Sequence, residues 1–138
     1  MSREVRAMNP PPRSTPTVHE MRLREAPFRA IAAGKKTIEM RLLDEKRQAL
    51  QVGDTIRFNL DTGAETVSAT VVALHVYPHF EALYADLLPR LGKIALGYDE
   101  DGKANPADML AYYSAESITL YGVVGIEIKQ KANHDHGI

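Results

Sequence analysis

The stretch that decides how this chain is interpreted is Gly34-Lys35-Lys36-Thr37-Ile38-Glu39-Met40-Arg41. At the two-residue period of a β-strand, Ile38 and Met40 lie on one face. The opposite face then carries polar side chains about 7 Å apart, at a rise of roughly 3.3 Å per residue: Thr37, Glu39 and Arg41. A strand that only covers a core needs the apolar face alone. The row of charges, with Lys36 at the strand entrance, therefore indicates a site.

The composition is that of an ordinary globular protein, with 138 residues, 44% of them hydrophobic and 25% charged. Seventeen Lys and Arg residues against eighteen Asp and Glu residues give a net charge of -1, which argues against a broad basic surface for long duplex nucleic acid. The absence of cysteine excludes disulfides and cysteine nucleophiles. No apolar run is long enough for a membrane span, and the N-terminus lacks a signal-peptide pattern, so we expect a cytoplasmic protein without membrane contact.

Three regions are expected along the chain. Residues 1–18 contain four prolines among polar residues and are predicted to form a disordered tail. Residues 130–138 are polar and are predicted to form a flexible C-terminal tail. The folded domain is then expected to span residues 19–129.

Hydrophobic periodicity and turn residues predict the elements of this domain. A short helix starts near Pro27 and ends at Gly34, and the signature strand follows. Asp44 caps a helical turn over residues 46–50, and Pro89 stops a helix over residues 79–88. Further strands are predicted over residues 55–60, 66–76 and 124–128, and a helix capped by Asn105 over residues 105–113. This order predicts an α+β fold, a small mixed or antiparallel β-barrel with flanking short helices.

The signature stretch resembles the G-x-K-x-x-E-x-R motif of the ASCH domain, a relative of the PUA RNA-binding domain. The resemblance continues in three further segments: residues 42–47, 52–54 and 112–114. It returns in Tyr121-Gly122-Val123-Val124-Gly125-Ile126 and covers roughly residues 21–128. It implies a PUA-like barrel with a cleft beside the signature strand, and single-stranded RNA, a nucleotide or a nucleoside as the ligand.

Some members of the ASCH family are hydrolases, either N4-acetylcytidine amidohydrolases or ribonucleases that cut single-stranded RNA. The amidohydrolase type uses a Lys, a Thr and a Glu. Its Lys falls on Lys36, but its Thr position is Glu39 here, which departs from that pattern. The loop Tyr98-Asp99-Glu100-Asp101 is the region expected to hold its separate Glu.

Two interpretations of Lys36, Glu39 and Arg41 are open. In the first they form an ion-pair ladder on a solvated face, which contributes about 0 to 1 kcal/mol to stability. In the second they line a cleft, where Lys and Arg bind phosphate and Glu39 orients the Arg or accepts a hydrogen bond from the ligand. The resemblance favours the cleft. The residues expected to bind RNA or a nucleotide are Lys35, Lys36, Thr37, Glu39, Arg41, Tyr112 and Ser114.

The segment Tyr112-Tyr113-Ser114 also has alternative roles. At helical spacing Tyr113 shares a face with Met109, so its ring is expected in the core, whereas Tyr112 points elsewhere and is available to stack on a base. Ser114 either caps the next turn or lines the cleft. The acids of the loop over residues 98–101 are expected to be solvated. The histidines lack the spacing of a metal site, so no metal and no cofactor are predicted.

Three functions follow from these residues. The first is a binding module for single-stranded RNA or a nucleotide. The second is a metal-independent hydrolase with Lys36, Glu39 and Arg41 as its catalytic residues. A bidentate pair between Glu39 and Arg41 would favour binding alone. The third is protein docking through Pro10-Pro11-Pro12-Arg13, which competes with a plain unstructured terminus.

Overall fold

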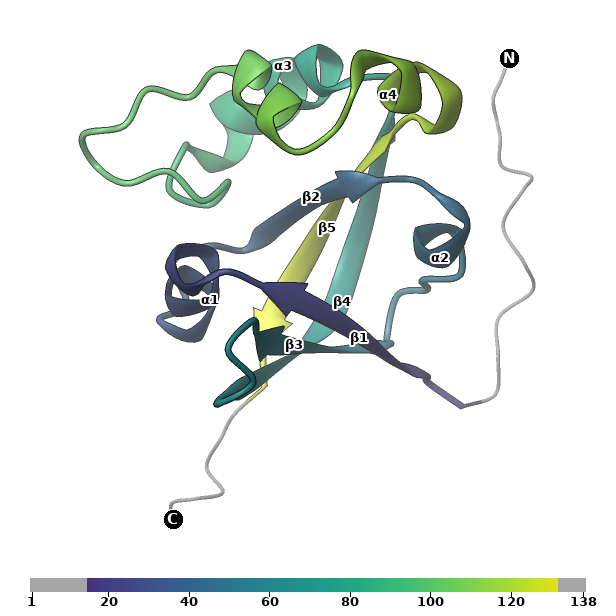
Figure 1. Ribbon diagram of the computed structural model, residues 1–138, viewed down its shortest axis with the longest axis vertical. Helices are drawn as coiled ribbons and strands as arrows, with labels where there is room; N and C mark the ends of the chain where they lie inside the picture. The colour runs from purple at the N-terminus through teal and green to yellow at the C-terminus, as the bar shows by residue number, and fades with distance from the viewer. Residues whose placement is uncertain (1–14, 132–138) are drawn as a thin grey trace.

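Five β-strands form one curled, mixed sheet in the computed structural model, which describes residues 15–131 (Figure 1). The strand order is β1-β3-β4-β5-β2. β1 runs parallel to β3, and the three other pairings are antiparallel. The strand bounds are Val18–Leu23, Ile38–Leu42, Thr55–Leu60, Thr66–Tyr77 and Val123–Gln130 for β1 to β5 in turn. The predicted α+β, barrel-like class is confirmed.

Short helices flank the sheet, as predicted. Helix α1 connects β1 to β2, while α3, a 3₁₀ helix named η2, and α4 lie together across one end of the sheet (Figure 1). The helix bounds are Glu25–Ala32 (α1), Glu45–Gln48 (α2), Phe80–Leu91 (α3), Pro106–Ala111 (η2) and Ala115–Tyr121 (α4). None of the helices among residues 15–131 is long and apolar enough to cross a membrane.

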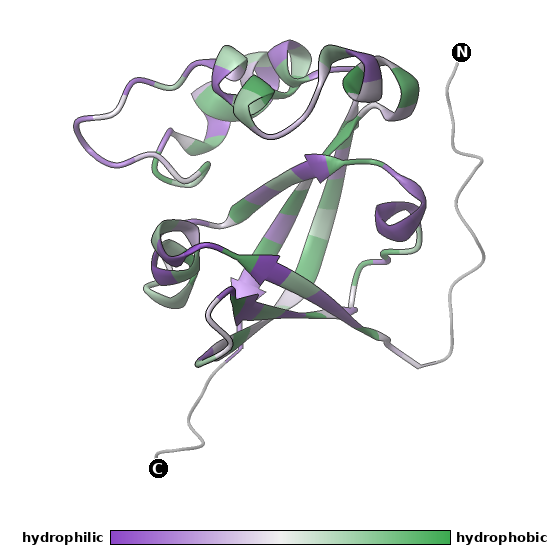
Figure 2. Ribbon diagram, viewed as in Figure 1, coloured by the Kyte–Doolittle hydropathy of each residue, from purple (hydrophilic) through white to green (hydrophobic). Residues whose placement is uncertain are grey.

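Two apolar clusters lie on opposite sides of the sheet. One fills the inside of the curl under α1 and includes Phe28, Phe58 and Ile126. The other packs Ile38 of β2 against Phe80 and other residues of α3. Figure 2 shows hydrophobic stretches along β4 and β5, in contrast to the hydrophilic α2. Because β5 contributes to both clusters, its residues 123–126 are all buried.

Gly125 allows α3 to approach the sheet closely. A Cβ atom at this position would lie 3.0 Å from Leu87 Cδ1 and 3.3 Å from Ile38 Cγ2. These distances are closer than ordinary carbon contacts of about 3.5–4.0 Å. The small residue in the middle of β5 is therefore required by the packing of the second cluster.

Several local predictions are confirmed. The Asp44 side chain accepts a hydrogen bond from the Arg47 backbone N–H at the start of α2. Asn105 caps η2 in the same way, through the Ala107 N–H. Gly34 adopts a φ of +78° just after α1, a conformation that favours glycine.

Other boundaries differ from the sequence prediction. Helix α3 continues through Pro89 to Leu91, because a proline in the last turn removes only one helical hydrogen bond. The helix predicted over residues 105–113 is a 3₁₀ helix that ends at Ala111. Helix α4 was not predicted, but the first alternative for Ser114 is confirmed, because its hydroxyl accepts from the Ser117 N–H and caps this helix. Strand β1 was also missed. Most of the tails predicted at residues 1–18 and 130–138 lies outside the described residues, but Val18 already belongs to β1 and Gln130 still belongs to β5.

Candidate functional site

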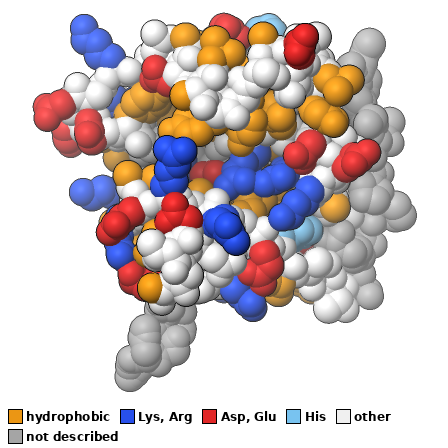
Figure 3. Space-filling model, in the orientation of Figure 1, with side chains coloured by type: hydrophobic (Ala, Val, Ile, Leu, Met, Phe, Trp, Pro, Cys, Tyr) orange, Lys and Arg blue, Asp and Glu red, His pale blue; other side chains and the backbone are white. Residues whose placement is uncertain are grey.

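The site lies where the two edges of the curled sheet face each other. β1 and β2 are the end strands of the sheet order. The Arg41 guanidinium on β2 bridges them, because its Nη2 donates to the Arg22 carbonyl oxygen on β1 at 3.2 Å. A pocket of about 850 Å³ opens at this point, between the two edge strands and η2. Figure 3 shows Lys and Arg side chains gathered across the middle of this face, next to hydrophobic side chains.

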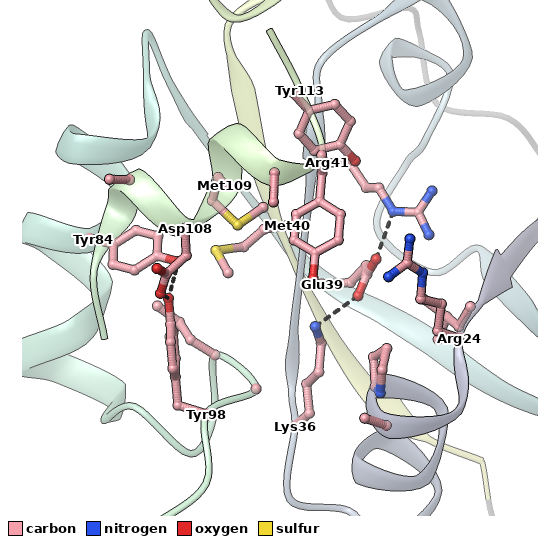
Figure 4. A pocket seen from close by; sticks show the side chains of 18 of the residues that line it. Arg24, Lys36, Glu39, Met40, Arg41, Tyr84, Tyr98, Asp108, Met109 and Tyr113 are labelled. Carbon is pink, nitrogen blue, oxygen red and sulfur yellow. Dashed lines mark hydrogen bonds and ion pairs between the residues drawn. The ribbon is translucent and has the colours of Figure 1, made fainter. Parts of the chain in front are cut away.

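A buried carboxylate holds two cations at the base of the pocket. Glu39 Oε2 accepts a hydrogen bond from Arg41 Nε at 2.6 Å, and Glu39 Oε1 lies 3.0 Å from Lys36 Nζ (Figure 4). Glu39 is only 4% exposed and Lys36 only 9%. Burial favours the protonated form of Glu39, but the attraction of Lys36 and Arg41 outweighs it and holds the pKa of Glu39 below its usual value. The three side chains together carry a net charge of +1.

The loop after α1 and the loop after α3 position Lys36. Its backbone N–H bonds the Ala30 carbonyl at 3.1 Å, so the residue is tied to the last turn of α1. Its side chain crosses Gly97, which has a φ of +105°. A Cβ atom on Gly97 would lie 3.2 Å from Lys36 Nζ and 3.1 Å from its Cδ. The ammonium group is thus confined between Glu39 and a glycine backbone.

Two arginines on β1 and just beyond it extend the charge along the pocket. Arg22 and Arg24 both line it, and within residues 15–131 neither guanidinium forms an ion pair. Arg24 immediately precedes α1, but its side chain makes no capping hydrogen bond. Its guanidinium carbon lies 6.0 Å from the centre of the Tyr112 ring, at the limit of a cation–π contact.

The two adjacent tyrosines of the next segment have different environments. Tyr113 stacks on Phe80 with ring centroids 6.0 Å apart and an angle of 17° between the planes, so its half-buried ring packs against the second apolar cluster and also lines the pocket. Burial raises the pKa of Tyr113. Tyr112 is 61% exposed and lines the pocket, as expected for a residue that is available to stack.

The wall opposite the cations consists of hydroxyl groups and one carboxylate. The Tyr98 hydroxyl donates to Asp108 Oδ2 at 2.7 Å and lies 2.9 Å from the Tyr84 hydroxyl. Burial raises the pKa of both tyrosines, so both hydroxyls keep their protons at neutral pH. Figure 4 shows this group on one side of the pocket and Lys36, Glu39 and Arg24 on the other, with Met40 and Met109 between them.

Comparison with known proteins identifies the family of this chain. The ASCH domain profile matches residues 21–132 of the chain, nearly all of the described part. The chain belongs to the ASCH domain family. A search of curated proteins found no match.

Two solved structures resemble this ASCH domain over most of its length. The crystal structure of the hypothetical protein PH0355 shares 31% identity with a TM-score of 0.64, over 83% of this chain and 99% of that one. The solution NMR structure of protein PF0455 from Pyrococcus furiosus shares 32% identity with a TM-score of 0.59, over 82% of this chain and 96% of that one.

The pocket brings together some of the residues that the sequence analysis selected. Four of the seven predicted site residues line it: Lys36, Glu39, Arg41 and Tyr112. Lys35, Thr37 and Ser114 do not. Lys35 is exposed beside the pocket, Ser114 caps α4, and the Thr37 backbone joins β5 by accepting from the Ile128 N–H. The first interpretation of Lys36, Glu39 and Arg41, an ion-pair ladder on a solvated face, is wrong because Glu39 and Lys36 are buried.

Three charged residues of the ASCH pocket were missed: Arg22, Arg24 and Asp108. The alternation of Met21 and Leu23 with Arg22 could have indicated the strand, but its partners on β3 lie 37 positions further along the chain, as in the pair Met21 and Phe58. Asp108 lies in the first turn of η2, where an acidic residue is common at the start of a helix and does not by itself indicate a site. The exposed acids of the 98–101 loop do not reach Lys36, which pairs with Glu39 instead.

The histidines of the described part are used within the fold. His75 Nε2 lies 2.8 Å from Glu127 Oε1, and His79 caps α3 by accepting from the Ala82 N–H. Among residues 15–131, no group of three or more His, Asp or Glu side chains is placed to hold a metal ion. His134 and His136 lie outside these residues.

Proposed function

We propose that this ASCH domain binds single-stranded RNA or a nucleotide in the pocket between β1 and β2. The observation that carries the proposal is the row of cations along one side of the pocket beside an exposed aromatic ring. The lining contains four cations against two carboxylates: Arg22, Arg24, Lys36 and Arg41 against Glu39 and Asp108. A phosphate group is the ligand that this excess of donors and positive charge favours.

The donors are held in place before a ligand arrives. Arg41 uses Nε for Glu39 and Nη2 for the Arg22 carbonyl, and within residues 15–131 no hydrogen bond occupies its Nη1. Lys36 Nζ has two more protons than its contact with Glu39 requires. Because Glu39 fixes both side chains, a phosphate at the pocket would meet donors that are already oriented, which reduces the entropy cost of binding.

Tyr112 and the size of the pocket define the rest of the ligand. An exposed tyrosine ring stacks on a base with a contribution of about 1–3 kcal/mol, whatever the base. A volume of about 850 Å³ falls within the range of roughly 300–1,000 Å³ that is usual for small-ligand sites. The pocket therefore suits one nucleotide or a short piece of single strand, with Tyr112 as the stacking ring.

Binding without hydrolysis is the form of this proposal that the geometry favours. The contact between Glu39 and Arg41 is a single one and not bidentate, at 2.6 Å from Arg41 Nε to Oε2. The other oxygen, Oε1, lies 3.0 Å from Lys36 Nζ, so both carboxylate oxygens face a cation. The same cations lower its pKa, which makes the carboxylate a weaker base. A metal-independent hydrolase that uses Glu39 as a general base is accordingly the second candidate, and one assay separates the two.

The test measures retention and cleavage of a labelled single-stranded RNA together, in EDTA. The variant Arg24→Ala is expected to weaken binding about tenfold, since a hydrogen bond to a charged group contributes about 1.5–3 kcal/mol. It removes a side chain that makes no ion pair within residues 15–131, so the fold is not disturbed. Lys129→Ala, an exposed cation on β5 away from the pocket, is the matched control and should leave the affinity unchanged.

Salt dependence and cleavage complete the assay. For contacts with two or three phosphates, the slope of log K against log salt is expected near −1.4 to −2.1, at about −0.7 per phosphate. A slope near zero, or equal losses in Arg24→Ala and Lys129→Ala, would contradict the proposal. Cleavage in EDTA that disappears in both Lys36→Ala and Glu39→Ala would establish the hydrolase instead.

A further inference from the structure

The wall opposite the cations has a defined hydrogen-bond polarity. The single proton of the Tyr98 hydroxyl is donated to Asp108 Oδ2, in the shortest contact of the group at 2.7 Å. Tyr98 then accepts from Tyr84, 2.9 Å away, and from the Asn105 N–H at 3.3 Å. Both hydroxyl protons are consumed inside the wall. What the wall offers to the pocket is therefore the carboxylate of Asp108, which only accepts hydrogen bonds.

The Asp108 carboxylate is more than a helix-terminal acid. Its hydrogen bond goes to Tyr98 across the wall and not to the backbone of η2. Asp108 is exposed and lines the pocket, and within residues 15–131 no hydrogen bond occupies its Oδ1. Tyr98 holds the carboxylate in one orientation. The pocket thus has a donor side, formed by Lys and Arg, and a fixed acceptor side.

An apolar floor separates these two sides. Met40 of β2 and Met109 of η2 lie between Lys36 and Asp108 in the close-up view (Figure 4). Both methionines are 7% exposed and line the pocket. Thioether sulfurs pack favourably against aromatic rings. A flat base over this floor would direct one edge toward Asp108 while its phosphate lies toward the cations.

We infer that the pocket selects a guanine nucleotide, through two N–H donors of the base that bind the Asp108 carboxylate. This inference rests on the proposed function and names the base that the same site prefers. Guanine is the base whose Watson–Crick edge has two adjacent donors, N1–H and the N2 amino group, and a carboxylate accepts both. Cytosine and adenine each place a ring-nitrogen acceptor beside their amino group. Uracil has a single N–H between two carbonyls, which a carboxylate repels.

The experiment compares the dissociation constants of GMP, CMP, AMP and UMP for the wild type, Asp108→Asn and Asp101→Asn. The wild type is expected to bind GMP at least tenfold more tightly than UMP. This is the size of effect that a bidentate hydrogen-bonded pair produces, since it discriminates against the wrong base by about 1–3 kcal/mol. Asparagine keeps the size of the side chain but offers one acceptor and one donor group. Asp108→Asn should therefore reduce the GMP-to-UMP ratio to about twofold or less. Asp101→Asn, an exposed acid outside the pocket, should preserve it.

Each outcome bears on one proposal or on both. The guanine inference would be overturned, and the binding function would remain, if all four nucleotides bound with equal affinity. The same would follow if Asp108→Asn kept the wild-type ratio of GMP to UMP affinity. No binding of any nucleotide, and none of a single-stranded tetranucleotide with one guanine among uridines, would overturn both. If the tetranucleotide with guanine binds more tightly than tetrauridine, and this preference depends on Asp108, the inference is supported for a single strand. If GMP binds more tightly than UMP, and this preference depends on Asp108, the inference is supported for a free nucleotide.

Discussion

Two buried carboxylates in this domain illustrate what separates a structural charge from a binding site. Asp54, 2% exposed, accepts hydrogen bonds from the backbone N–H groups of Thr17 and Gln51. It also lies 2.8 Å from His19 Nε2. These contacts tie the start of β1 to the turn before β3. Glu39, 4% exposed, contacts two cationic side chains that border a pocket.

The difference lies in the partners. Backbone N–H groups each have one proton, so Asp54 consumes them and leaves nothing for a ligand. Lys36 and Arg41 have several protons each, and Glu39 uses only some of them. The surplus of donors and of positive charge faces the pocket. A buried acid is thus a poor indicator of function by itself, whereas a buried acid that orients partly used cations at a cavity is a good one.

The largest expected effect comes from removing the acid at the pocket. Glu39→Ala should lower the free energy of unfolding by about 3 kcal/mol, because it leaves Lys36 and Arg41 near each other without their counter-charge. Urea denaturation measures this change, with the exposed Glu45→Ala as control. A loss below about 0.5 kcal/mol, as for an ordinary surface substitution, would contradict the account.

A somewhat smaller effect is expected at the structural carboxylate. Asp54→Ala should destabilise the fold by about 2 kcal/mol, since buried N–H donors lose their acceptor. Nucleotide affinity of the folded protein should stay within twofold of the wild type, measured by titration at a temperature where the variant is folded. A large loss of affinity here would remove the distinction between the two carboxylates.

A matched pair of glycines sharpens the comparison further. Gly97 and Gly92 both have positive φ, +105° and +89°, so alanine at either position should destabilise the fold by about 1 kcal/mol. Only at Gly97 does the added Cβ meet Lys36, and nothing lies within 4 Å of a Cβ at Gly92. Gly97→Ala should therefore weaken nucleotide binding severalfold, whereas Gly92→Ala should not. Equal affinities of the two variants would contradict the role of Lys36.

The smallest effect concerns pH. The pKa of Glu39 is lower in the folded protein than its ordinary value of 4.5, so its ionisation favours folding above pH 4.5. That contribution is lost as the pH falls through the folded pKa. Unfolding measured in urea between pH 5 and pH 3 should show a shallower loss of stability in Glu39→Gln than in the wild type. Parallel curves would show that Glu39 titrates alike in both states.

The sequence predicts the local features of this domain well and the long-range ones poorly. The polar row of Glu39 and Arg41 follows from a two-residue period within one strand, and the caps of Asp44 and Asn105 from turn chemistry within four residues. Arg24 and Asp108 belong to the site only because the sheet curls and η2 lies above it. No local pattern contains that information. The ASCH resemblance supplied the fold, but Asp108 lies outside the segments that carry it.

The most direct test of the central claim is an NMR titration that locates the ligand on the domain. With GMP or a short single-stranded RNA added to ¹⁵N-labelled protein, the shifted amides should cluster in residues 22–24, 36–41, 96–98 and 107–113, which border the pocket. The predicted result is that the shifts in these segments saturate with added ligand, and that Arg24→Ala needs more ligand to reach saturation. Saturating shifts confined to other surfaces, or no shifts with either ligand, would contradict the account.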